Sequence, residues 1–226
     1  MLREAGRVLA RVPLLDHCAA AAAVQAYGSP ELADRLLVRA GRGELVLTVG
    51  AQGRTGHDPA ELAVTARREG RAWLLEGVQT AVPWAFDADL VVVPAHVEST
   101  AGEGAVPALV PRETDGLVLA EQVSTSGERL AELRLRSVRV GPGEVIEAGG
   151  AWEWLRGLLV TGTRAPALGL GERVLRMTGE YTGRREQFGY PLHRCHAWAK
   201  HLELSLGPAA AYEEGLGDLL ATHPLG

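Results

Sequence analysis

The sequence predicts an α+β protein in which a central antiparallel β-barrel is flanked by N-terminal and C-terminal helices. Apolar residues recur at helical spacing before residue 43 and again after residue 149. Between them lie short segments rich in Val and Leu, separated by Gly, Pro and Asp turns. We therefore divide the chain into an N-terminal helical segment (1–43), a β-barrel domain (44–148) and a C-terminal helical segment (149–226).

The N-terminal segment is expected to form three helices. Residues 2–11 and 14–27 carry apolar side chains three and four positions apart. The third helix has clear end signals, because Ser29 is a good N-cap, Pro30 suits the first helical position and Gly41 suits a stop.

The middle of the chain is expected to form strands. Leu133 and Leu135 alternate with Glu132, Arg134 and Arg136, which is the period of a half-buried strand. No segment of helix length separates these strands, so we expect an antiparallel, barrel-like sheet.

Helical spacing returns at residue 151, although Pro166 and several glycines weaken it. Pro191 is expected to open another helix that runs to about residue 206. A last short helix is expected to reach Thr222.

Composition excludes several classes of function. The net charge is −5 and there is no basic tail or stripe, so we expect no nucleic-acid partner. Asp16 and His17 interrupt the apolar run that a signal peptide needs, and no stretch reaches the length of a membrane span. Two cysteines do not make a disulfide framework. We expect a cytoplasmic protein with no membrane partner.

Two groups of residues could carry chemistry without a cofactor. His57 and Asp58 could act as an acid–base pair, or Asp58 could simply cap a turn. His193 and His196 stand three apart on an expected helix, close enough to share a metal ion. No carboxylate joins them at good spacing, so we predict no metal site.

The stretch from Tyr181 to Trp198 contains Tyr-x-x-x-Arg-x-Gln-Phe-Gly-x-Pro-Leu, and it resembles the acyl-CoA dehydrogenase family. Other stretches agree with the family in sequence order: AYGSPELADRLLVRAGRGELVLTVG, GRTGHD, VTARREGRAWLLEGVQTAVPWAFDADLVVVPA and RSVRVGPGEVI. The resemblance implies the family's fold. It also implies a chemistry in which a carboxylate removes an α-proton from an acyl thioester while FAD accepts the β-hydride.

Several parts that the resemblance implies have no counterpart in this sequence. The positions that match the family's flavin-ring contacts are Ala51-Gln52, Ala81 and Pro83, and none carries a hydroxyl group. An alternative position for the base matches Leu159, which cannot ionise. The family's further helices, with its usual catalytic Glu, have no match before residue 226.

Other matching residues are present. The resemblance implies that Arg185, Gln187 and Phe188 correspond to residues that reach the pyrophosphate and adenine of FAD on a neighbouring subunit. Alternatively, Arg185 pairs with Glu186 or caps the preceding helix, and Phe188 fills a core between helices.

From these losses we predict a cofactor-independent, non-redox enzyme, such as a cyclase or isomerase, that acts on a polyketide-like or acyl small molecule. Its candidate pocket residues are His57, Asp58, Trp84, Trp152 and His196. The first alternative is an FAD-dependent acyl-CoA dehydrogenase subunit completed by a second chain, either a copy of itself or a homologous partner. The second alternative is a non-catalytic remnant.

Overall fold

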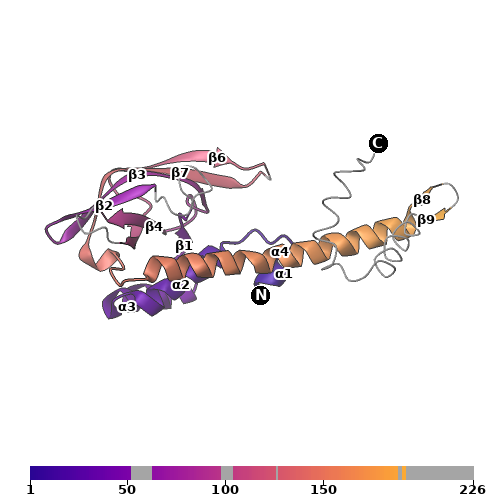
Figure 1. Cartoon of the computed structure of the whole chain (residues 1–226), viewed down its shortest axis with the longest axis horizontal. Helices are drawn as coiled ribbons and strands as arrows, with labels where there is room; N and C mark the ends of the chain where they lie inside the picture. Colours follow the sequence, from indigo (N-terminus) through magenta and orange to yellow (C-terminus); the bar gives the residue numbers. More distant parts are fainter. Residues whose placement is uncertain (52–62, 98–103, 126, 188–189, 192–226) are drawn as a thin grey trace, which may run out of the picture. The chain divides into compact units, whose positions relative to one another are not determined.

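The computed structural model describes residues 1–51, 63–97, 104–125, 127–187 and 190–191 (Figure 1). The structure divides into two compact units, residues 1–169 and residues 170–226, and each is described by itself.

Three helices open the first unit, as the sequence predicts: α1 (Leu2–Arg7), α2 (Leu14–Tyr27) and α3 (Pro30–Gly41). The hydroxyl of Ser29 accepts a hydrogen bond from the backbone N–H of Leu32 at 3.2 Å, which confirms the predicted N-cap. His17 joins α2 to the sheet, because its Nδ1 accepts a hydrogen bond from the backbone N–H of Leu47 at 3.2 Å.

Seven strands follow, and they confirm the β-rich middle of the chain: β1 (Leu47–Val49), β2 (Val64–Glu69), β3 (Ala72–Pro83), β4 (Leu90–Val97), β5 (Ala105–Pro111), β6 (Leu117–Val123) and β7 (Arg129–Val140). Along the sheet the order is β1-β4-β2-β3-β7-β6, and β5 pairs with the other edge of β4. A 3-10 turn, η1 (Pro142–Glu144), follows β7.

The predicted antiparallel barrel is wrong in two respects, because the sheet is mixed and it stays open as a half-barrel. Strand β4 runs parallel to both β1 and β2, whereas the other pairs are antiparallel. Asp89 explains the first parallel pair. Its carboxylate accepts from the N–H of Val46 at 2.7 Å and its own N–H donates to the Val46 carbonyl at 2.9 Å, so β1 and β4 start side by side.

Strand β3 is irregular toward its end. Its pairing with β7 shifts register between Leu75 and Gly77 and again between Gln79 and Val82. Ala81 and Trp84 adopt positive φ angles of 53° and 58°, which residues other than glycine rarely do. The backbone at this end of β3 therefore departs from regular strand geometry.

The core of the first unit has two parts. One lies between the N-terminal helices, β1 and the start of the helix that begins at Ala151; Ala20, Val24, Leu47, Trp152 and Leu155 are among its buried members. The other lies within the curved sheet, where Val64, Leu75, Val91, Leu133 and Leu135 are buried. These two cores hold the sheet and the first turns of that helix together as the framework of the first unit.

Helix α4 (Ala151–Arg184) is a single helix of 34 residues that continues through Pro166. Close packing with α1 accompanies this proline. A Cβ added at Gly6 would stand 2.1 Å from the Pro166 carbonyl oxygen, and one added at Gly169 would stand 1.8 Å from the carbonyl oxygen of Arg3. Glycine therefore lets the two backbones meet.

In the second unit, α4 leads into the short antiparallel strands β8 (Glu186–Gln187) and β9 (Tyr190–Pro191). Pro191, which was expected to open a helix, is instead a strand residue. The expected helices beyond it lie outside the described residues. Within the part of the chain that the structure describes, no helix is long and apolar enough to cross a bilayer.

Candidate functional site

Among the positions that the resemblance matches to the family's flavin-ring contacts, Ala51 follows β1, Ala81 and Pro83 lie at the end of β3, and Gln52 lies outside the described residues. The hydroxyl of Thr48 donates to the backbone carbonyl of Pro83 at 2.7 Å, which ties the two strands together. The N–H of Ala81 donates to the side-chain oxygen of Gln122 on β6 at 3.0 Å. Pro83 has no N–H to donate. The hydrogen-bonding groups at Ala81 and Pro83 are thus either absent or engaged within the protein.

Gln79 is, with Thr48, a buried polar residue of this region. It is 1% exposed, and its Nε2 is the side-chain nitrogen that finds no hydrogen-bond partner among the described residues. A Cβ at Gly50 would stand 2.9 Å from its Cγ, so the glutamine side chain fills the space beside that backbone. Because the amide is enclosed, it offers no donor to a bound ring.

A flavin ring needs donors aimed at its polar edge, and Ala51, Ala81 and Pro83 carry no side-chain donor. At these three positions the described half-barrel therefore does not fit the flavin ring.

A basic groove lies on α4 in the second unit. Its volume is about 470 Å³, and Arg173, Met177, Glu180, Tyr181, Arg184 and Arg185 line it. The spacing of 173, 177, 180 and 184 places these residues on one face of the helix. None of the three arginines is ion-paired to another described residue. A groove with three arginines against one glutamate favours an anion, and guanidinium groups suit phosphates.

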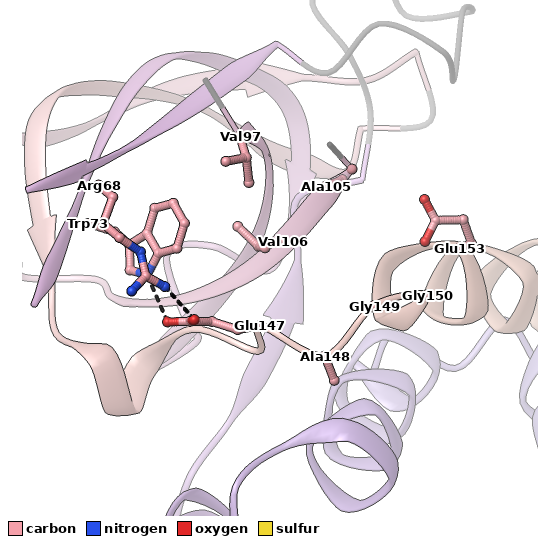
Figure 2. A pocket seen from close by; sticks show the side chains of 11 residues that line it. Arg68, Trp73, Val97, Ala105, Val106, Glu147, Ala148, Gly149, Gly150 and Glu153 are labelled. Atoms are coloured by element: carbon pink, nitrogen blue, oxygen red, sulfur yellow. Dashed lines mark hydrogen bonds and ion pairs between the residues drawn. The ribbon is translucent and has the colours of Figure 1, made fainter. Parts of the chain in front are cut away.

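A second cavity, of about 770 Å³, lies in the first unit where the half-barrel faces the start of α4 (Figure 2). Arg68 and Trp73 stand on neighbouring positions of β2 and β3. Glu147, in the segment before α4, accepts a hydrogen bond from the indole N–H of Trp73 at 3.1 Å and also binds Arg68. The guanidinium of Arg68 lies 4.5 Å from the centre of the Trp73 ring. Sequence reasoning missed this cluster, because nothing in the chain marks Glu147 as the partner of two residues so far from it.

Of the predicted site residues, the structure describes the side chains of Trp84, Trp152 and Arg185, the last of them in the second unit. Trp84 begins a turn after β3, where its carbonyl accepts from the N–H groups of Asp87 and Ala88 at 2.9 and 2.8 Å. Trp152 is 4% exposed and lies in the helical core, as does Leu159, and neither is among the described residues that line the larger cavity. Arg185 lines the basic groove, and its side chain does not pair with Glu186.

The remaining predicted residues, His57, Asp58, Phe188, His193 and His196, lie outside the described residues, and so does the side chain of Gln187. Among the residues that are described, no three His, Cys, Asp or Glu side chains gather as metal ligands.

Comparison with known proteins connects this architecture to one class. No protein-family model matches the chain. Acyl-CoA dehydrogenase FadE27 of Mycobacterium tuberculosis is 33% identical over 198 residues, which are 87% of this chain and 51% of the relative. The bovine mitochondrial short-chain specific acyl-CoA dehydrogenase is 31% identical over 150 residues, which are 63% of this chain and 36% of the relative.

Solved structures agree. The crystal structure of the ChsE4-ChsE5 complex from Mycobacterium tuberculosis matches with a TM-score of 0.80 and 33% identity, over 89% of this chain and 53% of that chain. A variant of the Tcur3481-Tcur3483 steroid ACAD matches with a TM-score of 0.80 and 30% identity, over the same shares.

This mixed half-barrel, preceded and followed by helices in the sequence, is the fold of the matched structures, and the relatives that match the sequence are acyl-CoA dehydrogenases. The chain belongs to the acyl-CoA dehydrogenase family. It spans about half the length of the relatives that it matches.

Proposed function

We propose that this chain serves in a heteromeric, FAD-dependent acyl-CoA dehydrogenase, in which a homologous partner chain holds the flavin ring. The observation that carries the proposal is the groove of Arg173, Arg184 and Arg185, whose charges no described residue neutralises. FAD would supply the hydride acceptor that no side chain can provide.

The two units of this chain suggest which part of FAD each chain of the complex would contact. In the first, the described positions that match the family's flavin-ring contacts carry no side-chain donor for the ring. In the second, the arginines suit a diphosphate, and Arg185 occupies the position that the family uses toward a neighbouring subunit. We infer that this chain reaches the diphosphate of a flavin that its partner holds.

Two relatives support a partner of the same family. ChsE4-ChsE5 is a complex of two differently named chains, and the Tcur3481-Tcur3483 steroid ACAD also carries two chain names. A heteromer of this kind would account for a member whose own half-barrel does not fit the ring. None of the relatives named above is a cyclase or an isomerase, so the non-redox enzyme that the sequence suggested gains no support.

The test is co-expression of the tagged chain with a longer acyl-CoA dehydrogenase homologue from the same genome. We expect the two to purify together, with a flavin spectrum and with dye reduction that depends on added acyl-CoA. Recovery of this chain alone from every such pair, without acyl-CoA-dependent reduction, would overturn the proposal.

Within such a complex, Arg185→Ala should weaken FAD retention by about tenfold, because a charge-assisted hydrogen bond contributes roughly 1.5–3 kcal/mol. Arg176→Ala is the matched control, since Arg176 lies on the same helix and is not among the groove residues. Equal FAD retention by the two variants would show that Arg185 does not contact the cofactor. It would not contradict the proposed heteromeric complex.

A further inference from the structure

The cavity between the half-barrel and α4 is not used by the proposed function. We propose that it binds a small organic cation, namely a molecule with an apolar body and one protonated amine. The proposal goes beyond the dehydrogenase assignment and does not depend on it.

The cavity is distant from the positions that match the flavin contacts. Trp73 stands near the beginning of β3, whereas Ala81 and Pro83 stand at its end. Ten residues of strand span up to about 30 Å. The mouth of a barrel is a frequent place for ligand pockets, and a volume of about 770 Å³ lies within their usual range.

One wall of the cavity is fixed and carries little net charge. Glu147 holds both the indole N–H of Trp73 and the guanidinium of Arg68, and the guanidinium in turn lies over the indole ring. The charges of Arg68 and Glu147 therefore offset each other. Three mutual contacts hold this wall in one arrangement before any ligand arrives, which lowers the entropic cost of binding.

The middle of the cavity is apolar. Val97 at the end of β4, with Ala105 and Val106 at the start of β5, presents side chains without polar atoms (Figure 2). This surface suits a ring or a short hydrocarbon chain, which gains free energy in proportion to the apolar area it buries. The ligand body is therefore expected to be apolar.

The opposite side carries the charge that selects an amine. Glu153, in the first turn of α4, lines the cavity, and no described residue forms an ion pair or hydrogen bond with its carboxylate. In Figure 2 this carboxylate stands across the cavity from the cluster of Arg68, Trp73 and Glu147. With Arg68 and Glu147 offset, the charged side chains of the described residues that line the cavity sum to one negative charge. A protonated amine near Glu153 would bring this sum of charges to zero.

The test uses three probes that share one body and differ in charge: 3-phenylpropan-1-amine, 3-phenylpropan-1-ol and 3-phenylpropanoate. Each is titrated into the full chain, with binding followed by calorimetry and by tryptophan fluorescence. We expect the amine to bind about fivefold more tightly than the alcohol, and the carboxylate to bind most weakly.

Two variants locate the site. Glu153→Gln should bring the amine down to the affinity of the alcohol, whereas Glu113→Gln, at an exposed position beside Arg112, makes the same change in charge and should leave the order unchanged. Val106→Trp should fill the cavity and abolish binding of all three probes. Melting curves confirm that each variant is folded, and Ala105→Leu replaces Val106→Trp if that variant unfolds.

Three outcomes would overturn the proposal. The carboxylate could bind as tightly as the amine, the filled cavity could bind the amine as the unaltered chain does, or none of the probes could bind at roughly millimolar concentration.

Discussion

Asp16, in the first turn of α2, carries a carboxyl group whose surroundings disfavour the ionised form. Burial raises the pKa of Asp16 to about 6, a hydrogen bond from its own backbone opposes that shift, and the nearby Glu128 adds to it. Because the folded pKa lies above the ordinary value of 3.8, the folded chain keeps a proton that the unfolded chain releases between these two values. Stability should therefore fall as the pH rises from about 4 to about 6 and remain lower above that.

Asp16→Asn should remove this dependence. At pH 7.5 the variant should gain about 1–3 kcal/mol in the free energy of unfolding, because the amide carries no charge to desolvate. Near pH 3.8 it should gain nothing. Urea unfolding at both pH values measures the difference. A gain of the same size at both would show that the charge of Asp16 is not the cause.

At the scale of elements, two glycines of α4 differ in their surroundings and allow a matched comparison. Gly169→Ala should destabilise the chain by roughly 2–4 kcal/mol, since its new methyl group would overlap the backbone of Arg3 on α1. Gly157→Ala meets nothing within 4 Å and should stabilise α4 by about 0.5–1 kcal/mol. Thermal unfolding of both variants checks the prediction, and a stabilised Gly169→Ala protein would disprove the close contact of α1 with α4.

The elements themselves could largely be predicted from the sequence. The helices around residues 14–27 and 30–41 follow from apolar spacing and from the cap at Ser29, and the strands follow from alternation such as that of Leu133 and Leu135. These are local signals, so a local pattern finds them. The weak point expected at Pro166 does not break α4, because packing against α1 outweighs the local preference.

Pairing between strands could not be predicted in the same way. Alternation shows which side chains face the core, but it does not say that β4 lies between β1 and β5 or that it runs parallel to β1. That arrangement depends on the contact of Asp89 with Val46, which are far apart in sequence. The hydrogen bond between Glu147 and Trp73 also joins residues that are far apart in sequence, so no local pattern predicts it. The motif around Arg185 stands out in the sequence because it is contiguous, and its role toward a cofactor stays a prediction.

At the scale of the whole molecule, the number of flavins that the proposed complex binds depends on whether the half-barrel of this chain can hold a flavin ring. A family member is expected to use FAD, yet the N–H of Ala81 is engaged by Gln122, and Pro83 offers no donor. If the partner chain holds a complete flavin site, the complex should contain fewer flavins than chains. The boundaries proposed from the sequence at residues 43 and 148 remain predictions, to be tested by limited proteolysis of that complex.

We expect the purified complex to contain one FAD for each pair of unlike chains, because Ala51, Ala81 and Pro83 carry no side-chain donor for the ring. Flavin absorbance after denaturation, divided by the molar amount of each chain, gives the ratio directly. Adding FAD to this chain alone should produce no bound flavin. The double variant Ala81→Trp and Pro83→Thr should not bind FAD either, because the enclosed Gln79 still fills the space beside Gly50. A ratio of two flavins per pair in an active complex would show that this half-barrel holds a ring after all, whereas failure to form any complex would contradict the heteromer itself. The two results are distinct, so the missing ring site and the partner subunit can be judged separately.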